Sequence, residues 1–426
     1  MTSLKQRTVG AIKWNLVDKI SAQLLYGVTG IILARLISKE DFGLVGAVLV
    51  FQAFASMFVD SGFASALIQR KAPSERDYST IFWFNMMMAV GLFIVLWFCA
   101  PLIARWNQND LRLIPLARVM FLTFILNAAG IVQTNRMVKM INVRPVALAN
   151  LLGQIMGAAV GLWLAFTRCD AWALVWQQVA MAGFRTLLLW LFIRWRPLMF
   201  FSVAVLRSFF SVGSGVMVQS FLNTVFQNII PFFVGHKVGM VPLGIYSQAD
   251  KWSKMASASL SQVITSSFLP ALSEVQDQPE RLANMTRTIH RKVSLLLFPT
   301  FILAIVLATP CFHLLFGTKW DAAIPLFRIL MGRGIFVVLC GLYCNFMLAV
   351  GRSRLLVVSE VVRDVVALVA LIVTLPFLGR TDGLILLVWG QFAATFVTFV
   401  VTLYMTAPTI HRTPLSLLSD LIKIRK

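Results

Sequence analysis

The chain has 426 residues, of which 59% are hydrophobic and only 13% are charged, and its mean hydropathy is +0.82. A soluble globular domain is far less apolar than this, so the composition excludes that class and indicates an integral membrane protein. A net charge of +21 suggests nucleic acid as a partner in a soluble protein, so the positions of the basic residues decide what the charge means here.

Apolar stretches of roughly 20 residues, enough to cross a bilayer as a helix, occur along the whole chain. In chain order they are 12–36, 43–68, 79–104, 113–134, 146–166, 171–193, 209–234, 243–271, 289–309, 322–349, 355–377 and 383–406. The sequence therefore predicts an all-α polytopic membrane protein with about twelve transmembrane helices.

Lys and Arg residues fall mainly in the connections on one side of these predicted helices. If the N-terminus is cytoplasmic, the inner connections carry most of them, as in the segments 70–76 and 281–292. This bias follows the positive-inside rule and predicts that both termini are cytoplasmic. The charge therefore indicates topology and attraction to anionic lipid, and we expect no nucleic-acid partner.

The first half of the chain recurs in the second. Ile-Pro-Leu-Ala-Arg at 114–118 returns as Ile-Pro-Leu-Phe-Arg at 324–328, and Gly43 is matched by Gly244. Such a long repeat predicts two whole lobes, and six spans in each make the repeat parallel. The expected domains are a six-helix lobe at 1–195, an interfacial linker at 196–208 along the inner membrane surface, a second six-helix lobe at 209–407 and a basic cytoplasmic tail at 408–426.

Four predicted helices carry polar residues spaced one turn apart. They are Asn15, Lys19 and Gln23; Asn150 and Gln154; Gln219, Asn223 and Gln227; and Glu360 and Asp364. Polar groups are costly against lipid tails, so we expect the stripes to face inward and outline a hydrated central cleft between the lobes. The alternative is that the amides hold neighbouring helices together, at about 0.6 kcal/mol each.

Ionisable residues within the predicted spans are stronger candidates, because each costs about 3 kcal/mol at the bilayer centre unless it is paired or hydrated. Lys19, Lys251, Lys254 and Arg333 are the expected groups that attract an anion such as a diphosphate. The remaining candidates are carboxylates that could bind a coupling ion, H⁺ or Na⁺: Asp60, Glu360 and Asp364. Mutual neutralisation of Asp250 with Lys254, and of Glu360 with Arg363, is the alternative interpretation.

Several motifs are missing from the sequence. It holds no Gly-rich phosphate loop, HExxH, GxSxG or paired CxxC, and its five cysteines lack metal-ligand spacing. We therefore expect no enzymatic activity, no cofactor and no metal site.

Four runs of residues resemble the polysaccharide flippases of the Wzx type, a family related to the multidrug and toxin exporters and to the lipid II flippase. The first two, at 33–44 and 60–71, read LARLISKEDFGL and DSGFASALIQRK, and the second pair, at 243–249 and 269–277, reads LGIYSQA and LPALSEVQD. The resemblance covers essentially the whole chain. Some of these flippases carry fourteen helices, two more than we expect here.

The resemblance implies a V-shaped pair of six-helix lobes that opens alternately to the two sides of the bacterial inner membrane. It implies ion-coupled transfer of an undecaprenyl-diphosphate-linked oligosaccharide for O-antigen, capsule or exopolysaccharide synthesis, with a polymerase and glycosyltransferases as partners. The alternatives are a multidrug or cation exporter of the same superfamily, and a polytopic O-antigen polymerase or ligase.

Overall fold

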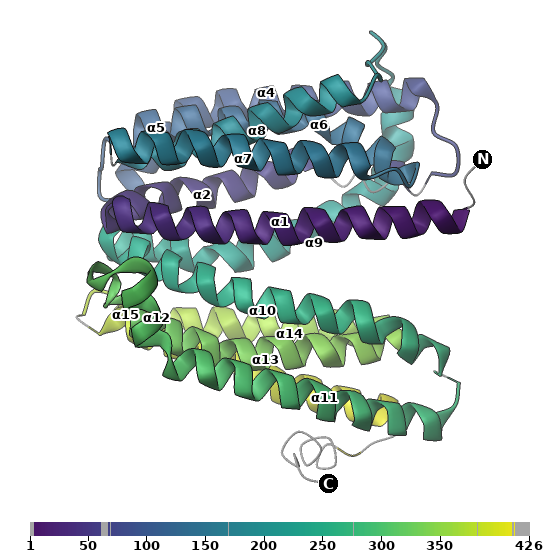
Figure 1. The fold of residues 1–426 in the computed structure, drawn as a ribbon, viewed down its shortest axis with the longest axis vertical. Helices are drawn as coiled ribbons and strands as arrows, with labels where there is room; N and C mark the ends of the chain where they lie inside the picture. Colours follow the sequence, from purple (N-terminus) through teal and green to yellow (C-terminus); the bar gives the residue numbers. More distant parts are fainter. Residues whose placement is uncertain are drawn as a thin grey trace. The chain divides into compact units, whose positions relative to one another are not determined.

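A computed structural model describes residues 4–60, 67–68, 70–168, 170–275, 277–380, 382–410 and 413. The described elements are helices, in agreement with the predicted all-α class (Figure 1). Their bounds are α1 Leu4–Leu36, α2 Lys39–Asp60, α4 Glu75–Trp106, α5 Leu113–Met120, α6 Leu122–Lys139, α7 Arg144–Thr167, α8 Ala171–Phe192, α9 Val203–Lys237, α10 Met240–Glu274, α11 Pro279–Val306, α12 Ala308–Phe316, α13 Ala323–Ala349, α14 Ser353–Thr374 and α15 Gly383–Thr406, with short 3₁₀ turns at Thr318–Trp320, Leu375–Phe377 and Ala407–Ile410.

Eight helical stretches of the described residues are long and apolar enough to cross a membrane: Val9–Leu36, Lys39–Phe58, Glu75–Trp106, Leu113–Lys139, Arg144–Thr167, Glu280–Val306, Ala323–Ala349 and Gly383–Thr406. The other four predicted spans fall on α8, α9, α10 and α14. Two of these helices, α9 and α14, carry predicted polar stripes. The number of twelve crossings stays a prediction.

The chain forms two compact units, Met1–Gly244 (unit 1) and Ile245–Lys426 (unit 2). Unit 1 extends past the predicted lobe boundary because α9 packs against α2 and α4. The units follow packing, whereas the predicted lobes follow the sequence repeat, so the lobes at 1–195 and 209–407 stay predictions. Most of the predicted tail, at 411–412 and 414–426, lies outside the described residues.

Unit 1 is built around the close packing of α7 against α8, with α1 along the other side of α7 (Figure 1). Three glycines one turn apart on α7, Gly153, Gly157 and Gly161, form this contact. A Cβ atom at any of them would lie 2.7–2.9 Å from side-chain or backbone atoms of α8. Small residues at this spacing allow two membrane helices to approach at backbone distance.

The segment between α8 and α9 is an extended strap that is bound to α4. Trp195 Nε1 donates to Glu75 Oε2 at 2.6 Å, and the Leu198 amide donates to Ser79 Oγ at 2.9 Å. Trp83 Nε1, also on α4, donates a hydrogen bond to the Leu198 carbonyl at 2.8 Å. The extended segment ends at Ser202, which caps α9, so the last residues of the predicted linker at 196–208 belong to the helix that begins at Val203. Its position at the membrane surface stays a prediction.

Unit 2 packs α13 and α14 against α15, and α11 against α13 (Figure 1). Its interior is rich in aromatic side chains, including Phe301, Tyr343, Phe346 and Phe399, which are nearly inaccessible. Aromatic pairs with ring centroids 5–7 Å apart add stability beyond the burial of their area. This interior fixes the rotation of α13, and hence the direction of its polar residues.

Candidate functional site

Arg333, at the middle of α13, is held by neighbouring helices of unit 2. Its Nε donates to Thr395 Oγ1 at 3.0 Å and its Nη1 to Gln391 Oε1 at 3.1 Å, both on α15. The Gln391 amide in turn donates to the Tyr246 hydroxyl on α10 at 3.4 Å. Its two partners, Thr395 and Gln391, are uncharged, so they orient the guanidinium without neutralising it. A fixed cation of this kind is suited to a phosphate.

The two predicted cations on α10 have different surroundings. Lys254 Nζ lies 2.7 Å from Asp250 Oδ2, one turn away, and the exposed fractions of the two side chains are 52% and 11%. Lys251 Nζ lies 5.3 Å from the centroid of the Trp252 ring. The Asp250–Lys254 pair therefore matches the interpretation of mutual neutralisation, while Lys254 keeps its solvent access.

On α14 the ion pair differs from the one considered in the sequence. Arg363 Nε lies 3.0 Å from Asp364 Oδ1, whereas the alternative considered from the sequence pairs Arg363 with Glu360. Asp364 thus carries a cation partner, and Glu360 is half-buried. The roles of both carboxylates in ion coupling stay predictions.

The predicted polar stripes of unit 1 lie partly on its surface. Asn15, Lys19, Asn223 and Gln227 are exposed, and Gln227 Nε2 donates to Asn223 Oδ1 within α9 at 3.0 Å. Gln23 is half-buried. The role of these residues, as helix bridges or as the lining of a cleft, stays a prediction. The side chains of Asp60 and Gln219 lie outside the described part of the chain, and the cleft between the predicted lobes stays a prediction.

The sequence did not predict a hydrogen-bonded network of polar side chains that joins three helices of unit 1. Asn150 on α7 donates from Nδ2 to Asp18 Oδ2 on α1 at 3.0 Å and accepts from Arg185 Nε on α8 at 2.7 Å. Gly153, one turn along α7, lets the backbone of Arg185 approach. The amide thus links an anion to a cation that are too far apart in sequence to be matched by spacing. Asn150 was predicted as part of a stripe, but its two charged partners were not.

Replacing Asn150 with alanine is expected to destabilise unit 1. The substitution leaves Asp18 and Arg185 without their shared amide in a half-buried environment, at a cost of about 1–3 kcal/mol. The midpoint of thermal unfolding of the purified protein in detergent should fall by several degrees. Asn15→Ala, at an exposed position of α1, is the control and should leave the midpoint unchanged; equal midpoints for both variants would contradict the linking role.

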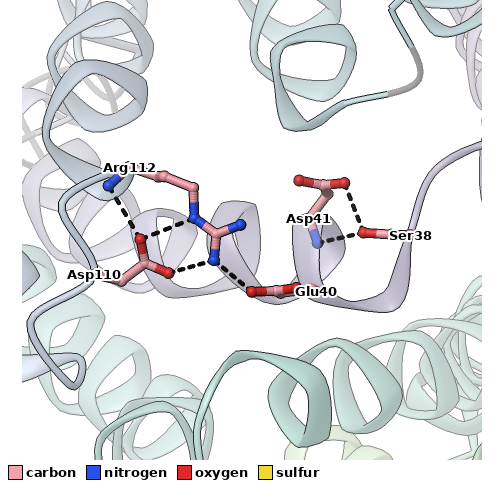
Figure 2. Close-up of polar contacts among 5 residues, drawn as sticks. All are labelled: Ser38, Glu40, Asp41, Asp110 and Arg112. Carbon is pink, nitrogen blue, oxygen red and sulfur yellow. Dashed lines mark hydrogen bonds and ion pairs between the residues drawn. The ribbon is translucent and has the colours of Figure 1, made fainter.

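A second polar network lies in the loop after α4 and involves the first turn of α2 (Figure 2). Arg112 bonds Asp110 through Nε at 3.0 Å and through Nη2 at 2.7 Å, and Nη2 also contacts Glu40. Hydrogen bonding to Arg112 lowers the pKa of Asp110, while Asp110 and Glu40 raise the pKa of Arg112. The network ties the loop to α2. The sequence analysis did not single out these residues.

The lowered pKa of Asp110 predicts a pH-dependent contribution to stability. Because the folded-state pKa lies below the ordinary value of 3.8, the contribution is present above that pH and is lost as the pH falls through the folded-state value. Asp110→Asn should therefore lower the unfolding midpoint at pH 7. The difference from the wild type should shrink in acid below about pH 4. A difference that stays constant down to pH 2.5 would contradict this assignment.

Comparison with known protein families shows the family to which the chain belongs. A family model described as "Polysaccharide biosynthesis protein" matches residues 32–325. The chain belongs to this family. Together with the relatives below, this match confirms the predicted resemblance to Wzx-type polysaccharide flippases. It also confirms the prediction of a multi-pass membrane protein of polysaccharide transport.

Curated relatives are similar along most of the chain. The teichuronic acid biosynthesis protein TuaB of Bacillus subtilis is 24% identical, over 83% of this chain and 74% of its own. The succinoglycan biosynthesis transport protein ExoT of Rhizobium meliloti is 26% identical, over 84% and 72%. The lipopolysaccharide biosynthesis protein WzxC of Escherichia coli is 26% identical, over 78% and 68%.

Solved structures show the same fold. The lipid II flippase MurJ in an inward closed conformation has a TM-score of 0.77 at 12% identity, over 97% of this chain and 90% of its own. An inward-facing multidrug transporter of the MATE family has a TM-score of 0.68 at 14% identity, over 96% and 99%. At these identities the likeness concerns the fold, which is that of the superfamily predicted from the sequence.

Proposed function

We propose that the protein flips an undecaprenyl-diphosphate-linked oligosaccharide from the cytoplasmic to the periplasmic leaflet of the bacterial inner membrane. The single observation that carries this proposal is Arg333, a cation within a membrane helix whose observed donor bonds go to neutral side chains. A diphosphate is the ligand that such a guanidinium recognises best, through paired charge-assisted hydrogen bonds. The polyprenyl chain of the substrate stays in the lipid.

The transport cycle in this proposal is alternating access coupled to H⁺ or Na⁺, with no catalytic step. Moving a glycan and a diphosphate through hydrocarbon without partners for their polar groups is prohibitively costly. The exposed polar residues of α1 and α9 and the cations of α10 and α13 are candidates to supply such partners. Both termini are cytoplasmic in the proposed topology, since the basic residues follow the positive-inside rule.

The ion pairs of unit 2 support a glycolipid over a cationic drug. Two described carboxylates of its membrane helices, Asp250 and Asp364, already have a cation beside them, Lys254 and Arg363 respectively. A cation exporter needs carboxylates that are free to receive its substrate. The described connections on the proposed outer side, such as 107–112 and 317–322, are also short for the catalytic loop of a polymerase or ligase.

Deletion of the gene in its host is the decisive test. Surface polysaccharide should disappear, and undecaprenyl-diphosphate-linked repeat units should accumulate in the cytoplasmic leaflet, where an impermeant glycosidase reaches them in inverted vesicles but not in spheroplasts. A plasmid copy should restore the polymer. Unchanged polymer with increased sensitivity to cationic drugs would favour the exporter instead.

A further inference from the structure

A pocket lies in the loop region of unit 1. It has a volume of about 620 Å³ and lies between the loop after α4, at 107–112, and residues 238–242, which form the turn after α9 and the start of α10, with Glu40 of α2 beside them. Small-molecule sites in proteins commonly have volumes of about 300–1,000 Å³. In the proposed topology this end of unit 1 faces the periplasm.

The wall formed by the loop is held in an unusual backbone conformation. Gln108 and Asn109 both have φ of 59°, in the left-handed region that non-glycine residues seldom adopt. The turn is fixed because the buried Asn107 donates from Nδ2 to the Ile103 carbonyl at 2.9 Å and Arg112 clamps Asp110. Left-handed residues kept in place by their surroundings often belong to binding sites. Here both left-handed residues carry exposed amide side chains.

The opposite wall is main chain that comes close to the loop. Gly239 has φ of 104°, and a Cβ atom there would lie 2.9 Å from Gln108 Oε1. Only glycine combines this backbone with this approach. Trp106, which precedes the loop, stacks on His236 with ring centroids 4.1 Å apart, and its carbonyl lies 2.6 Å from His236 Nδ1. The two walls are therefore fixed relative to each other within unit 1.

The charges of the pocket exclude an anion as its ligand. Its charged lining residues are Glu40, Asp110 and Arg112, so carboxylates outnumber guanidinium groups by two to one. Arg112 already donates hydrogen bonds from Nε and Nη2 to these two carboxylates (Figure 2). A diphosphate would meet net negative charge here, in contrast to Arg333 in unit 2.

A polyhydroxylated ligand fits these groups instead. Each amide offers both donors and an acceptor, and a carboxylate accepts from hydroxyl groups, which themselves donate and accept. We propose that this pocket is a binding site for sugar rings, and that it receives the oligosaccharide of the lipid-linked substrate at the periplasmic end of unit 1. Gln108 and Asn109 are the specificity-determining residues. The proposal rests on the proposed function for the identity of the glycan and for the side of the membrane.

The test uses the full-length protein in phospholipid nanodiscs and, as the probe, the free repeat-unit oligosaccharide released from the host's lipid intermediate by mild acid. Saturation-transfer NMR should detect binding to the wild type. The variant Gln108→Gly/Asn109→Gly removes both amides and keeps the left-handed backbone accessible, so it should bind at least tenfold more weakly with an unchanged unfolding midpoint. Thr318→Ala, an exposed change in the corresponding turn before α13, is the matched control and should bind like the wild type.

Two results would overturn the proposed glycan site. One is the absence of saturation transfer to the probe with the wild type, and the other is equal binding by the wild type and the double glycine variant. Competition by inorganic pyrophosphate would also overturn it, because the site would then be an anion site. None of these results bears on the deletion experiment. Loss of polymer on deletion together with a failed glycan test would reject the pocket alone, whereas retained polymer would reject the proposed function itself.

Discussion

Arg333→Ala should reduce surface polysaccharide by about ten- to a hundredfold while the protein remains in the membrane, because each charge-assisted hydrogen bond to a phosphate is worth about 1.5–3 kcal/mol. The neutral partners Gln391 and Thr395 keep their own contacts with α10 and with the α15 backbone, so unit 2 should still fold. Polymer per cell, divided by the amount of flippase in the membrane fraction, is the quantity to measure. Arg333→Lys, which keeps the charge but loses the planar fork, should give an intermediate value.

Arg118→Ala is the matched control for this experiment. Arg118 also lies on a membrane helix, but its guanidinium stacks on the Trp97 ring at 4.8 Å, and its Nε donates to the Trp97 carbonyl at 3.4 Å. Its removal should leave polymer output unchanged. Lys254→Ala is a second test, since Lys254 remains half-exposed beside Asp250. Normal output from both Arg333→Ala and Lys254→Ala would reject the proposed diphosphate site.

Alanine at Gly43 should prevent stable folding of unit 1. A Cβ atom at Gly43 would lie 1.8 Å from the Met240 carbonyl oxygen, and one at Gly244 would lie 1.9 Å from the Lys39 carbonyl oxygen. Both obstacles are backbone atoms, so no change of rotamer relieves them, and the expected cost is about 3 kcal/mol or more. Gly244→Ala should behave in the same way. Export and the yield of folded protein in detergent should both collapse.

Gly91→Ala supplies the control for the glycine variants. Gly91 lies within α4, and a Cβ atom there would meet nothing within 4 Å. Alanine favours a helix over glycine by about 1 kcal/mol, so this variant should be as stable as the wild type or slightly more stable. If Gly43→Ala kept the wild-type unfolding midpoint and export activity, that result would contradict the close approach of α2 to the start of α10.

The two glycines also show how far the repeat could be read. Gly43 and Gly244 were matched in the sequence as equivalent positions of two lobes. Their contact is reciprocal, since each glycine packs against the residue four positions before the other. Equivalence of position is a property of the sequence, but contact between equivalent positions depends on where the start of α10 lies against α2. The structure supplied that second fact.

The sequence by itself determined the class of the protein, the approximate extent of its helices and its family. These follow from local properties: the length of apolar stretches, the side on which basic residues accumulate, and motifs such as the run at 33–44. The last predicted span, 383–406, coincides with α15, because a glycine start and a long apolar run bound that helix clearly.

Only the tertiary structure decided which polar groups meet. Arg333 was predicted as a site residue, but its bonds to α15 were not; the Asp18–Asn150–Arg185 chain and the pocket beside Gln108 were not anticipated either. A helical period shows which residues share a face, yet it does not show which face of another helix lies opposite. That choice is made by close packing, through glycines such as Gly153 and through the aromatic interior of unit 2, and such packing joins residues far apart in the chain.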